Sequence, residues 1–467
     1  MTRPGPLRRL LDGGAGRDNL PQLDGLRAAA VVAILVRHAW GVAGSPNWVV
    51  HLPFLAPISM TPFVLTLAAG VDLFFVLSGY LLARRFLQTD FEGRPRPSVR
   101  DYFRSRAYRI LPLYWVTLVL VLALLTPRLI PTEEVLSVRG LFSFLAHAAV
   151  LQASFLVSYG SYSVASPFWT LTIEVVFYAV LPFLVVLFHR NRWMVTLPAC
   201  IAVTLGWLWL ARSSLGPVVD LLPGTAGRPG IPPEHARYFL SKQFPAHLAD
   251  FAFGITVANL VCRARLATNP GRVARALASP AAGAVYLTAG VAATLVFLQV
   301  NGTISNRHHL SFFPLQVFQE GGWAFTWYYY LEELPFGASF ALVLAGLLLC
   351  GPALRRPFEV GWVRLIGVLG YSIYLFHMPL IRWVNTHPAL ADDSPNARFL
   401  WLMAGAVATV IPLAVVAYLT IERPFMRRGR RRRSDRAARP APIHLDDGAS
   451  SREPAAPDGA VPALERT

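Results

Sequence analysis

The sequence predicts an all-α membrane protein, a polytopic bundle of about ten transmembrane helices with both termini in the cytoplasm. Three observations carry this prediction. Hydrophobic residues make up 54% of the 467 residues and charged residues only 15%, with a mean hydropathy of +0.46. The apolar residues form long runs, and arginines gather between alternate runs. This composition is typical of multi-span membrane proteins and excludes a soluble globular fold.

Ten segments have the roughly 17–25 apolar residues that a helix needs to cross a bilayer. They are 26–44, 60–83, 108–126, 168–188, 194–212, 244–262, 280–299, 336–352, 364–384 and 399–420. The stretch 141–158 is also apolar, but it is short and contains His147 and Gln152. We interpret it as an interfacial or re-entrant helix.

The formal charge of +17 is carried almost entirely by arginine, since Lys242 is the only lysine. In a soluble protein a pI near 10.5 would suggest nucleic-acid binding. Here the positive-inside rule accounts for the charge, so we expect no nucleic-acid partner. The arginine-rich connections alternate with poorer ones, which predicts a multi-pass protein of the cell (plasma or inner) membrane with cytoplasmic termini.

The spans divide the chain into three parts. Residues 1–19 are a cytoplasmic N-terminal segment, 20–425 the transmembrane domain, and 426–467 a basic, disordered cytoplasmic tail. Seven arginines lie between Arg423 and Arg433, where they suit contact with anionic membrane lipids. The three cysteines, at 200, 262 and 350, show no paired spacing, so we expect no disulfide framework, no metal site and no bound cofactor.

Ionisable side chains deep inside spans are costly and therefore candidates for function. Arg27 and His38 share a face of the first span, eleven residues or about 16 Å apart. Asp72, His377 and Glu174 lie about 18, 19 and 24 Å above the cytoplasmic ends of their own spans. Titratable groups from four spans thus fall within roughly two helical turns of depth. The alternative is that each ties helices together by structural hydrogen bonds.

A pair of arginines marks the start of the third span. Arg106 and Arg109 stand at i, i+3 spacing on one helix face. Guanidinium pairs at this position suit a polyphosphate on the cytoplasmic side. Ordinary positive-inside charge is the simpler explanation of the spacing alone.

Six motifs occur in the order of a known family. They are LDGLRAAAVVAILVRH (23–38), GVDLFFVLSGYLL (70–82), YFRSRAYRILPLYW (102–115), WTLTIEVVFY (169–178), LGYSIYLFHMPL (369–380) and IERPF (421–425). Together they resemble the acyltransferase-3 family of integral membrane O-acyltransferases, over residues 20–425. The resemblance implies transfer of an acyl group, commonly acetyl, from cytoplasmic acyl-CoA as co-substrate, with acetyl-CoA the expected donor. The acceptor would be a hydroxyl of an extracytoplasmic or lipid-linked carbohydrate, or of a glycosylated metabolite.

The resemblance also implies roles for individual residues. The Arg-x10-His element of the family falls on Arg27 and His38, and its histidine is held to be essential. The Arg-x-x-Arg element, associated with the acyl donor, falls on Arg106 and Arg109. The other motif residues singled out are Asp72 and Glu174 as catalytic carboxylates, with His377, Trp169 and Tyr371 as supporting candidates.

Two departures from the family pattern stand out. Members often carry a second carboxylate directly after the Glu174 position, where this sequence has Val175. Many members also carry an extracytoplasmic esterase-like domain at the C-terminus, and no such domain follows the basic tail here. We therefore expect the chain to complete the reaction alone or with a separate partner.

The mechanism expected from these residues is direct transfer with His38 as general base, in preference to an acyl-histidine intermediate. Asp72 is the first candidate to orient His38, and Glu174 or His377 could take its place. Arg27, Arg106 and Arg109 would bind the phosphates of coenzyme A at the cytoplasmic face. The pantetheine arm would then rise along the first helix to His38.

A different class of function also fits the charged residues. In a proton-coupled transporter or flippase, Arg27, Asp72 and His38 would form a proton relay. A scaffold protein would leave the in-phase Arg27–His38 pair unexplained. Aromatic residues crowd the connection 300–335, where an interfacial belt is a more common role than stacking on an acceptor sugar. The acceptor, the acyl chain and the oligomeric state do not follow from the sequence.

Overall fold

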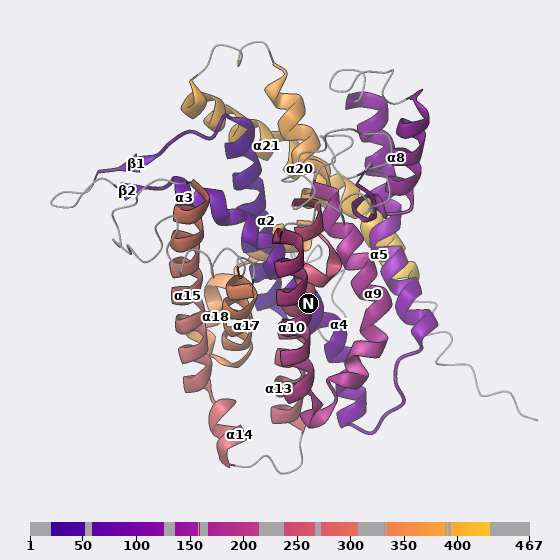
Figure 1. Cartoon of the computed structure of the whole chain (residues 1–467), viewed down its shortest axis with the longest axis vertical. Coiled ribbons are helices and arrows are strands. Elements are labelled where there is room, and N and C mark those ends of the chain that lie inside the picture. The colour runs from indigo at the N-terminus through magenta and orange to yellow at the C-terminus, as the bar shows by residue number, and fades with distance from the viewer. Residues whose placement is uncertain are drawn as a thin grey trace, which may run out of the picture.

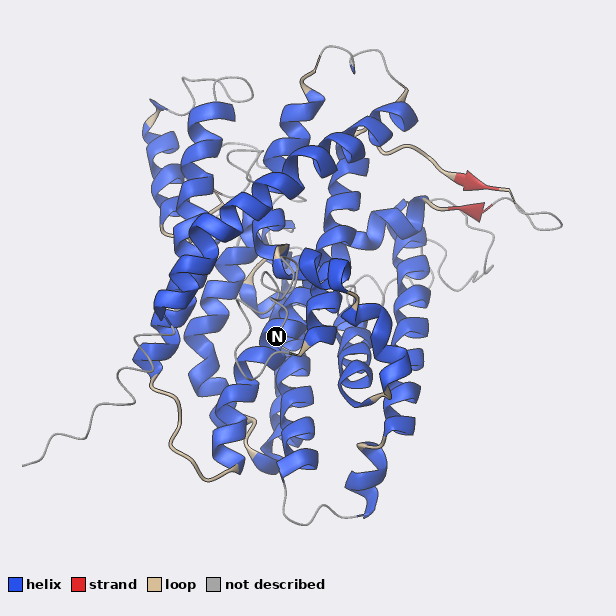
Figure 2. Cartoon of the chain, turned by 180° about the vertical axis from the view of Figure 1, so that it is seen from behind, coloured by secondary structure: helices blue, strands red, loops and turns tan. Residues whose placement is uncertain are grey.

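The computed structural model describes residues 20–51, 58–125, 136–156, 158, 167–213, 238–266, 272–306, 331, 334–387, 390 and 394–429. The predicted N-terminal segment 1–19, most of the predicted tail, and the aromatic stretch 312–330 lie outside these residues. The described part is almost entirely helical, which confirms the all-α prediction (Figures 1 and 2). Its only sheet is the two-stranded hairpin of β1 (Val49–Val50) and β2 (Ile58–Ser59).

The described helices are connected by segments of different lengths. In chain order they are α2 (Pro21–Val42), α3 (Thr61–Leu65), α4 (Gly70–Phe91), α5 (Val99–Leu120), α8 (Val138–Ala148), α9 (Trp169–Leu187), α10 (Trp193–Arg212), α13 (Phe244–Leu266), α14 (Arg272–Leu277), α15 (Pro280–Asn306), α17 (Leu334–Leu349), α18 (Pro352–Glu359), α19 (Gly361–Val368), α20 (Gly370–Asn385) and α21 (Pro395–Ala417). A 3₁₀ turn, Thr66–Ala69, joins α3 to α4, and π-type turns follow α5 and α21.

Each of the ten predicted spans contains one of the long helices. Among the described residues, eight helices are long and apolar enough to cross a membrane, or up to ten if each of two bent pairs is one span. The first pair, α17 and α18, bends by 109°, and the second, α19 and α20, bends by 69°. The chain is therefore a multi-pass membrane protein; the bend between α19 and α20 falls inside the ninth predicted span, and the bend between α17 and α18 falls at the end of the eighth.

The centre of the bundle is the pair α4 and α13, which cross at very short range. A side chain at Gly79 would meet the Phe251 carbonyl oxygen at 2.3 Å, and one at Gly254 would meet the Val76 carbonyl oxygen at 2.1 Å. Small residues at a crossing allow backbones to approach closely, which is the usual way for helices to associate in a membrane. The phenylalanine Phe251 is itself fully buried at this crossing.

Helix α2 packs beside α4 and is enclosed by the two bent pairs. Its first turn carries the buried Asp24, whose carboxylate lies 3.0 Å from the Arg27 guanidinium and 3.6 Å from that of Arg364 on α19. The backbone of Asp24 touches Gly367, where any side chain would collide with it. The bend between α19 and α20 thus places one half of the ninth span against the start of α2.

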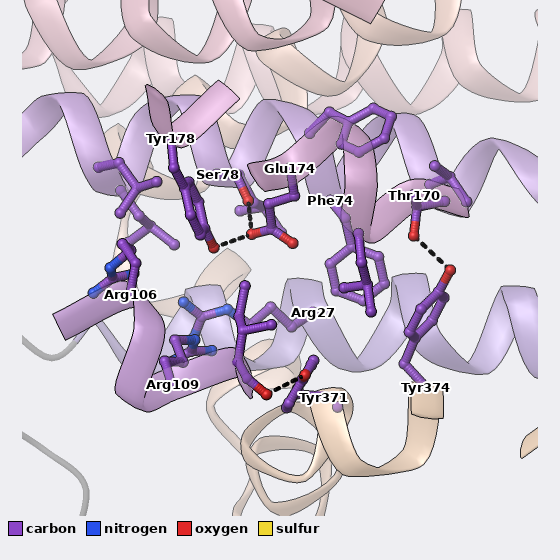
Figure 3. A pocket seen from close by; sticks show the side chains of 18 of the residues that line it. Arg27, Phe74, Ser78, Arg106, Arg109, Thr170, Glu174, Tyr178, Tyr371 and Tyr374 are labelled. Atoms are coloured by element: carbon purple, nitrogen blue, oxygen red, sulfur yellow. Dashed lines mark hydrogen bonds between the residues drawn. The ribbon is translucent and has the colours of Figure 1, made fainter. Parts of the chain in front are cut away.

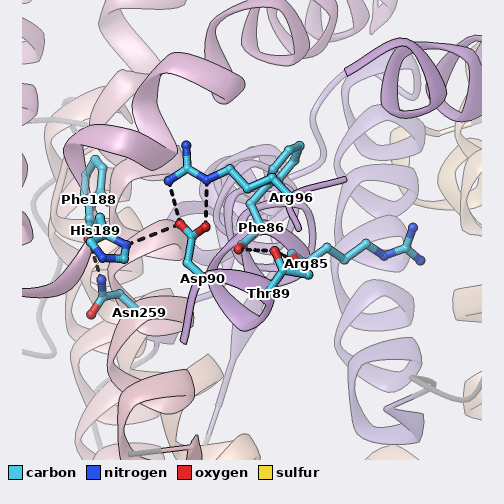
Figure 4. Close-up of polar contacts among 8 residues, drawn as sticks. All are labelled: Arg85, Phe86, Thr89, Asp90, Arg96, Phe188, His189 and Asn259. Atoms are coloured by element: carbon cyan, nitrogen blue, oxygen red, sulfur yellow. Dashed lines mark hydrogen bonds and ion pairs between the residues drawn. The ribbon is translucent and has the colours of Figure 1, made fainter. Parts of the chain in front are cut away.

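The ends of α4, α9 and α13 are tied together by polar contacts (Figure 4). Asp90 at the end of α4 accepts two hydrogen bonds from Arg96, at 2.7 and 2.8 Å, and lies 3.3 Å from His189 after α9. Asn259 on α13 is fully buried and donates to the Phe188 carbonyl oxygen. These contacts fix the ends of three helices relative to one another.

The stretch 141–158, which we interpreted as an interfacial or re-entrant helix, overlaps α8. Its eleven residues are too few to cross a bilayer. The helix turns Leu141 and Leu145 outward, with 58% and 56% of their surface exposed, while Ser143 and His147 face the protein and are buried. Helix α8 therefore presents apolar side chains away from the bundle and polar ones toward it.

Candidate active site

A cavity of about 220 Å³ opens between α4, α5, α9, α19 and α20, and arginines line one end of it. Arg27, Arg106 and Arg109 contribute to this end, as the close view shows (Figure 3). Arg84 and Arg85 from the last turns of α4 line the same cavity. The three arginines that the sequence assigned to a donor site are thus brought together from α2 and α5, with two more beside them.

The opposite end of the cavity is aromatic and polar without positive charge. Phe74, Thr170 and Tyr374 lie there, away from the arginines (Figure 3). The Thr170 hydroxyl and the Tyr374 hydroxyl are 2.6 Å apart. The Tyr371 hydroxyl, between the two ends, donates to the Ile110 carbonyl oxygen at 2.8 Å. The cavity therefore changes from cationic to apolar along its length, which suits a ligand with an anionic head and a neutral arm.

Glu174 projects into the middle of this cavity from α9. Its carboxylate accepts hydrogen bonds from the Tyr178 hydroxyl at 2.5 Å and the Ser78 hydroxyl at 3.2 Å. The Tyr178 ring also lies 6.0 Å from the guanidinium of Arg106. Glu174 thus lines the cavity, where two hydroxyl groups hold its carboxylate.

Two further acidic residues balance the arginines from outside the cavity. Asp24 pairs with Arg27 as described above. Glu422, in the π-type turn after α21, is buried and accepts a hydrogen bond from the Ser372 hydroxyl at 2.9 Å. Glu422 also interacts electrostatically with Arg109 and Arg27. Buried guanidinium groups need such partners, because an unpaired charge is costly away from water.

His38 of α2 contacts His377 of α20, whose ring lies beside that of Tyr374, while neither histidine is among the residues that line the cavity. The Nδ1 of His38 lies 3.0 Å from the Nε2 of His377, and the two ring centroids are 5.0 Å apart. His377 is 1% exposed, whereas His38 is half-buried. The sequence placed both at similar depth in separate spans, and the structure brings them into direct contact.

The hydrogen bonds of this pair determine which ring nitrogens carry protons. A carbonyl oxygen only accepts, so the Nδ1 of His377, which lies 2.5 Å from the Tyr374 carbonyl oxygen, is the donor. The neutral His377 ring then presents an unprotonated Nε2, which accepts from Nδ1–H of His38. His38 is left with a lone pair on Nε2, the form required of a general base.

Helix α20 connects the two parts of the site. Tyr371, Tyr374 and His377 follow one another at intervals of three residues on this helix. Tyr371 and Tyr374 line the cavity, and the Tyr374 ring lies 5.5 Å from the His377 ring. From Tyr371 to His377 the helix rises about 9 Å. One face of α20 thus leads from the arginines to the histidine pair.

Asp72, the first candidate to orient His38, lies elsewhere. Its carboxylate is 3.6 Å from His247 of α13, which in turn is 3.5 Å from Asp250. Trp169 belongs to this same group, since its ring centroid is 5.7 Å from that of His247. His377, an alternative orienting candidate, makes the contact to His38. Asp72 and Trp169 belong to a second polar group around His247.

Sequence reasoning missed several residues of the site. Arg84 and Arg85 were attributed to the positive-inside rule. Their spacing does not distinguish an arginine that lines a cavity from one that only sets the orientation of a span. Glu422 could have been found, since an acidic residue at the end of a span is unusual. Ser78 and Tyr178 carry no signal of their own in a sequence.

Comparison with known proteins places the chain in a family. A family model described as an acyltransferase domain, of the acyltransferase-3 type, matches residues 20–419. The chain belongs to this acyltransferase family. The match covers most of the chain and confirms the resemblance seen in the motifs.

Several curated relatives of this acyltransferase-3 protein are similar at low identity. The peptidoglycan O-acetyltransferase OatA of Listeria monocytogenes is 24% identical, over 88% of this chain and 57% of OatA. The exopolysaccharide production protein ExoZ of Rhizobium meliloti is 28% identical, over 78% of this chain and 92% of ExoZ. A putative peptidoglycan O-acetyltransferase, YrhL of Bacillus subtilis, is 25% identical over 88% of this chain and 55% of YrhL. The chain spans little more than half the length of OatA and YrhL. No solved structure matches it.

Proposed function

We propose that this acyltransferase-3 protein is an O-acetyltransferase that moves the acetyl group of acetyl-CoA to a hydroxyl of a cell-envelope carbohydrate. The observation that carries the proposal is that Tyr371 and Tyr374 of the arginine-lined cavity stand on the same helix as His377, which contacts the Tyr374 ring on one side and His38 on the other. A carbohydrate acceptor is supported by relatives named for peptidoglycan O-acetylation and exopolysaccharide production.

The donor would bind with its phosphates at the arginine end. Arg27, Arg106 and Arg109 offer charge-assisted hydrogen bonds to phosphate oxygens, and Arg84 and Arg85 add positive charge. Because Arg27 and His38 lie on the same unbroken helix, they are separated by about 16 Å along its axis. The neutral pantetheine arm would cover this distance through the aromatic end. In this proposal the protein lies in the plasma or inner membrane, and the arginine end and both termini face the cytoplasm.

His38 would act as the general base of a direct transfer. Its Nε2 takes the proton of the acceptor hydroxyl as the oxygen attacks the thioester carbonyl. The carbon–sulfur bond then breaks, and the departing thiolate takes this proton back from His38 to give free coenzyme A. His377 is a positioning residue in this scheme, because its Nε2 accepts from Nδ1–H of His38 and steadies the imidazolium that forms.

The test uses the purified full-length protein in nanodiscs. Radiolabelled acetyl-CoA is mixed with de-O-acetylated envelope polysaccharide from a deletion strain, and label in the polysaccharide and free coenzyme A are measured together. Wild type should transfer label and release coenzyme A only when acceptor is present. His38→Ala should abolish both while binding acetyl-CoA with the wild-type affinity. Full transfer by His38→Ala, or movement of acceptor across the membrane without release of coenzyme A, would sink the proposal.

A further inference from the structure

A second buried group of polar side chains joins the two central helices. Asp72 comes from the first turn of α4, and His247 and Asp250 stand one turn apart on α13. All three are at least 95% buried. One potential ligand atom from each lies within 4.8 Å of the other two. The group takes no part in the proposed transfer. Spacing in the sequence does not reveal it, because Asp72 lies on a different helix from His247 and Asp250.

The distances in this group differ from those of hydrogen bonds. The Nδ1 of His247 is 3.6 Å from the Asp72 carboxylate and 3.5 Å from that of Asp250. A hydrogen bond between a charged nitrogen and a carboxylate is about 2.7–2.9 Å long. A tetrahedral metal ion with ligand bonds of about 2.1 Å holds neighbouring ligand atoms about 3.4 Å apart. Both measured separations match ligands of one shared ion better than direct hydrogen bonds.

Neighbouring residues keep space for these side chains and hold the imidazole in place. Any side chain at Gly337 of α17 would meet the Asp250 carboxylate at 2.0 Å, so glycine is required beside it. The His247 ring contacts Phe75 and Trp169, with centroids 5.0 and 5.7 Å away. Phe75 also lines the donor cavity. The group is therefore rigidly packed and only one aromatic ring away from that cavity.

We propose that Asp72, His247 and Asp250 bind a divalent transition-metal ion, with Zn²⁺ the best match, that links α4 to α13. One imidazole and two carboxylates are ligands that Zn²⁺ accepts, with three protein ligands leaving a fourth position for water. Mg²⁺ and Ca²⁺ fit less well, because they prefer more oxygen ligands than this group supplies.

Metal content is measured on full-length protein carrying a tag without histidine. The protein is stripped with chelator, dialysed against Zn²⁺ and analysed by mass spectrometry for zinc per chain. Wild type should hold about one ion, and its Tm should fall on renewed chelation. His247→Asn and Asp250→Asn should weaken zinc affinity more than about tenfold, since even changes around a ligand cost that much. His51→Asn, which removes an exposed imidazole, is the matched control and should bind as wild type.

A second measurement does not depend on variants that lose a ligand. Co²⁺ in place of Zn²⁺ should give wild-type protein visible absorption, and His247→Cys should retain the ion and add a thiolate charge-transfer band. The proposal is overturned if wild type takes up no zinc beyond background, or if His247→Asn binds as much as wild type. A group that only carries protons would show no zinc uptake and no cobalt spectrum, which also overturns it.

Discussion

The Nδ1 of His38 and the Nε2 of His377 lie 3.0 Å apart, although 339 positions separate the two residues in the chain. This contact joins the first span to the ninth and leaves His38 with a lone pair on Nε2. In hydrolases with a serine nucleophile, a carboxylate performs the orienting task. In the proposed transfer a neutral, buried imidazole, that of His377, would perform it, anchored on the Tyr374 carbonyl.

Replacing His377 should lower turnover without weakening donor binding. His377→Leu removes the acceptor for Nδ1–H of His38, so kcat should fall about 10²–10⁴-fold. His377→Gln, which can still offer an oxygen near the position of Nε2, should retain more activity than His377→Leu. The donor KM of both should stay within about twofold of wild type. Steady-state kinetics with acetyl-CoA decide the matter, and equal kcat for both variants would contradict the orienting role.

Removing arginines of the cavity should act mainly on the donor. Arg106→Gln and Arg109→Gln each lose a charge-assisted hydrogen bond of about 1.5–3 kcal/mol, which corresponds to roughly 10–100-fold in the donor KM. Arg263→Gln is the control. Arg263 lies in the last turn of α13, outside the cavity, and donates a hydrogen bond to Asn191. Its donor KM should match that of wild type. An equal rise in all three variants would indicate a general loss of positive charge instead of a binding site.

Glu422 should matter to stability far more than a surface carboxylate. Glu422→Gln removes a buried negative charge that faces Arg109 and Arg27, so the free energy of unfolding should fall by about 3–5 kcal/mol. Glu359 is one-third exposed and lies 3.9 Å from Arg355. Glu359→Gln should change stability by at most about 1 kcal/mol. Thermal unfolding in detergent compares the two, and similar losses would mean that Glu422 is not a counter-charge.

The crossing of α4 and α13 should tolerate no side chain. Gly254→Ala forces the backbone of Val76 away, at a cost of about 1–3 kcal/mol. Gly206→Ala on α10 meets no atom within 4 Å and should be neutral or slightly stabilising. Both variants are compared by thermal unfolding. Unchanged stability of Gly254→Ala would show that the two helices separate easily.

The sequence was sufficient for the helices because each must satisfy its backbone within the bilayer and therefore shows as one apolar run. The break between α19 and α20 was not foreseen, because both of these helices are apolar and they read as one run. Depth along a span was also readable, and it brought His38 and His377 to a common level. The direction in which a side chain points between helices could not be read from the sequence. Asp72 was therefore paired with His38, whereas its carboxylate lies beside His247.

The residues proposed to bind the donor show the same division. The sequence could single out Arg106 and Arg109 as a pair, because spacing within one helix is a property of the sequence. Arg84, Arg85 and Glu422 reach the same region only through contacts among α4, α21 and α5, which no local pattern encodes.

The interlocked glycines of α4 and α13 limit how the protein can work. Alternating access requires one group of helices to rock or slide against another around a fixed substrate. Gly79 and Gly254 hold the two central helices backbone to backbone, and any relative sliding would drive Val76 or Phe251 into the opposite chain. The middle of the bundle therefore behaves as a stationary frame. In the proposed transfer, the flexible arm of the donor would carry the acetyl group past α4 and α13, so these two helices would not need to slide against each other.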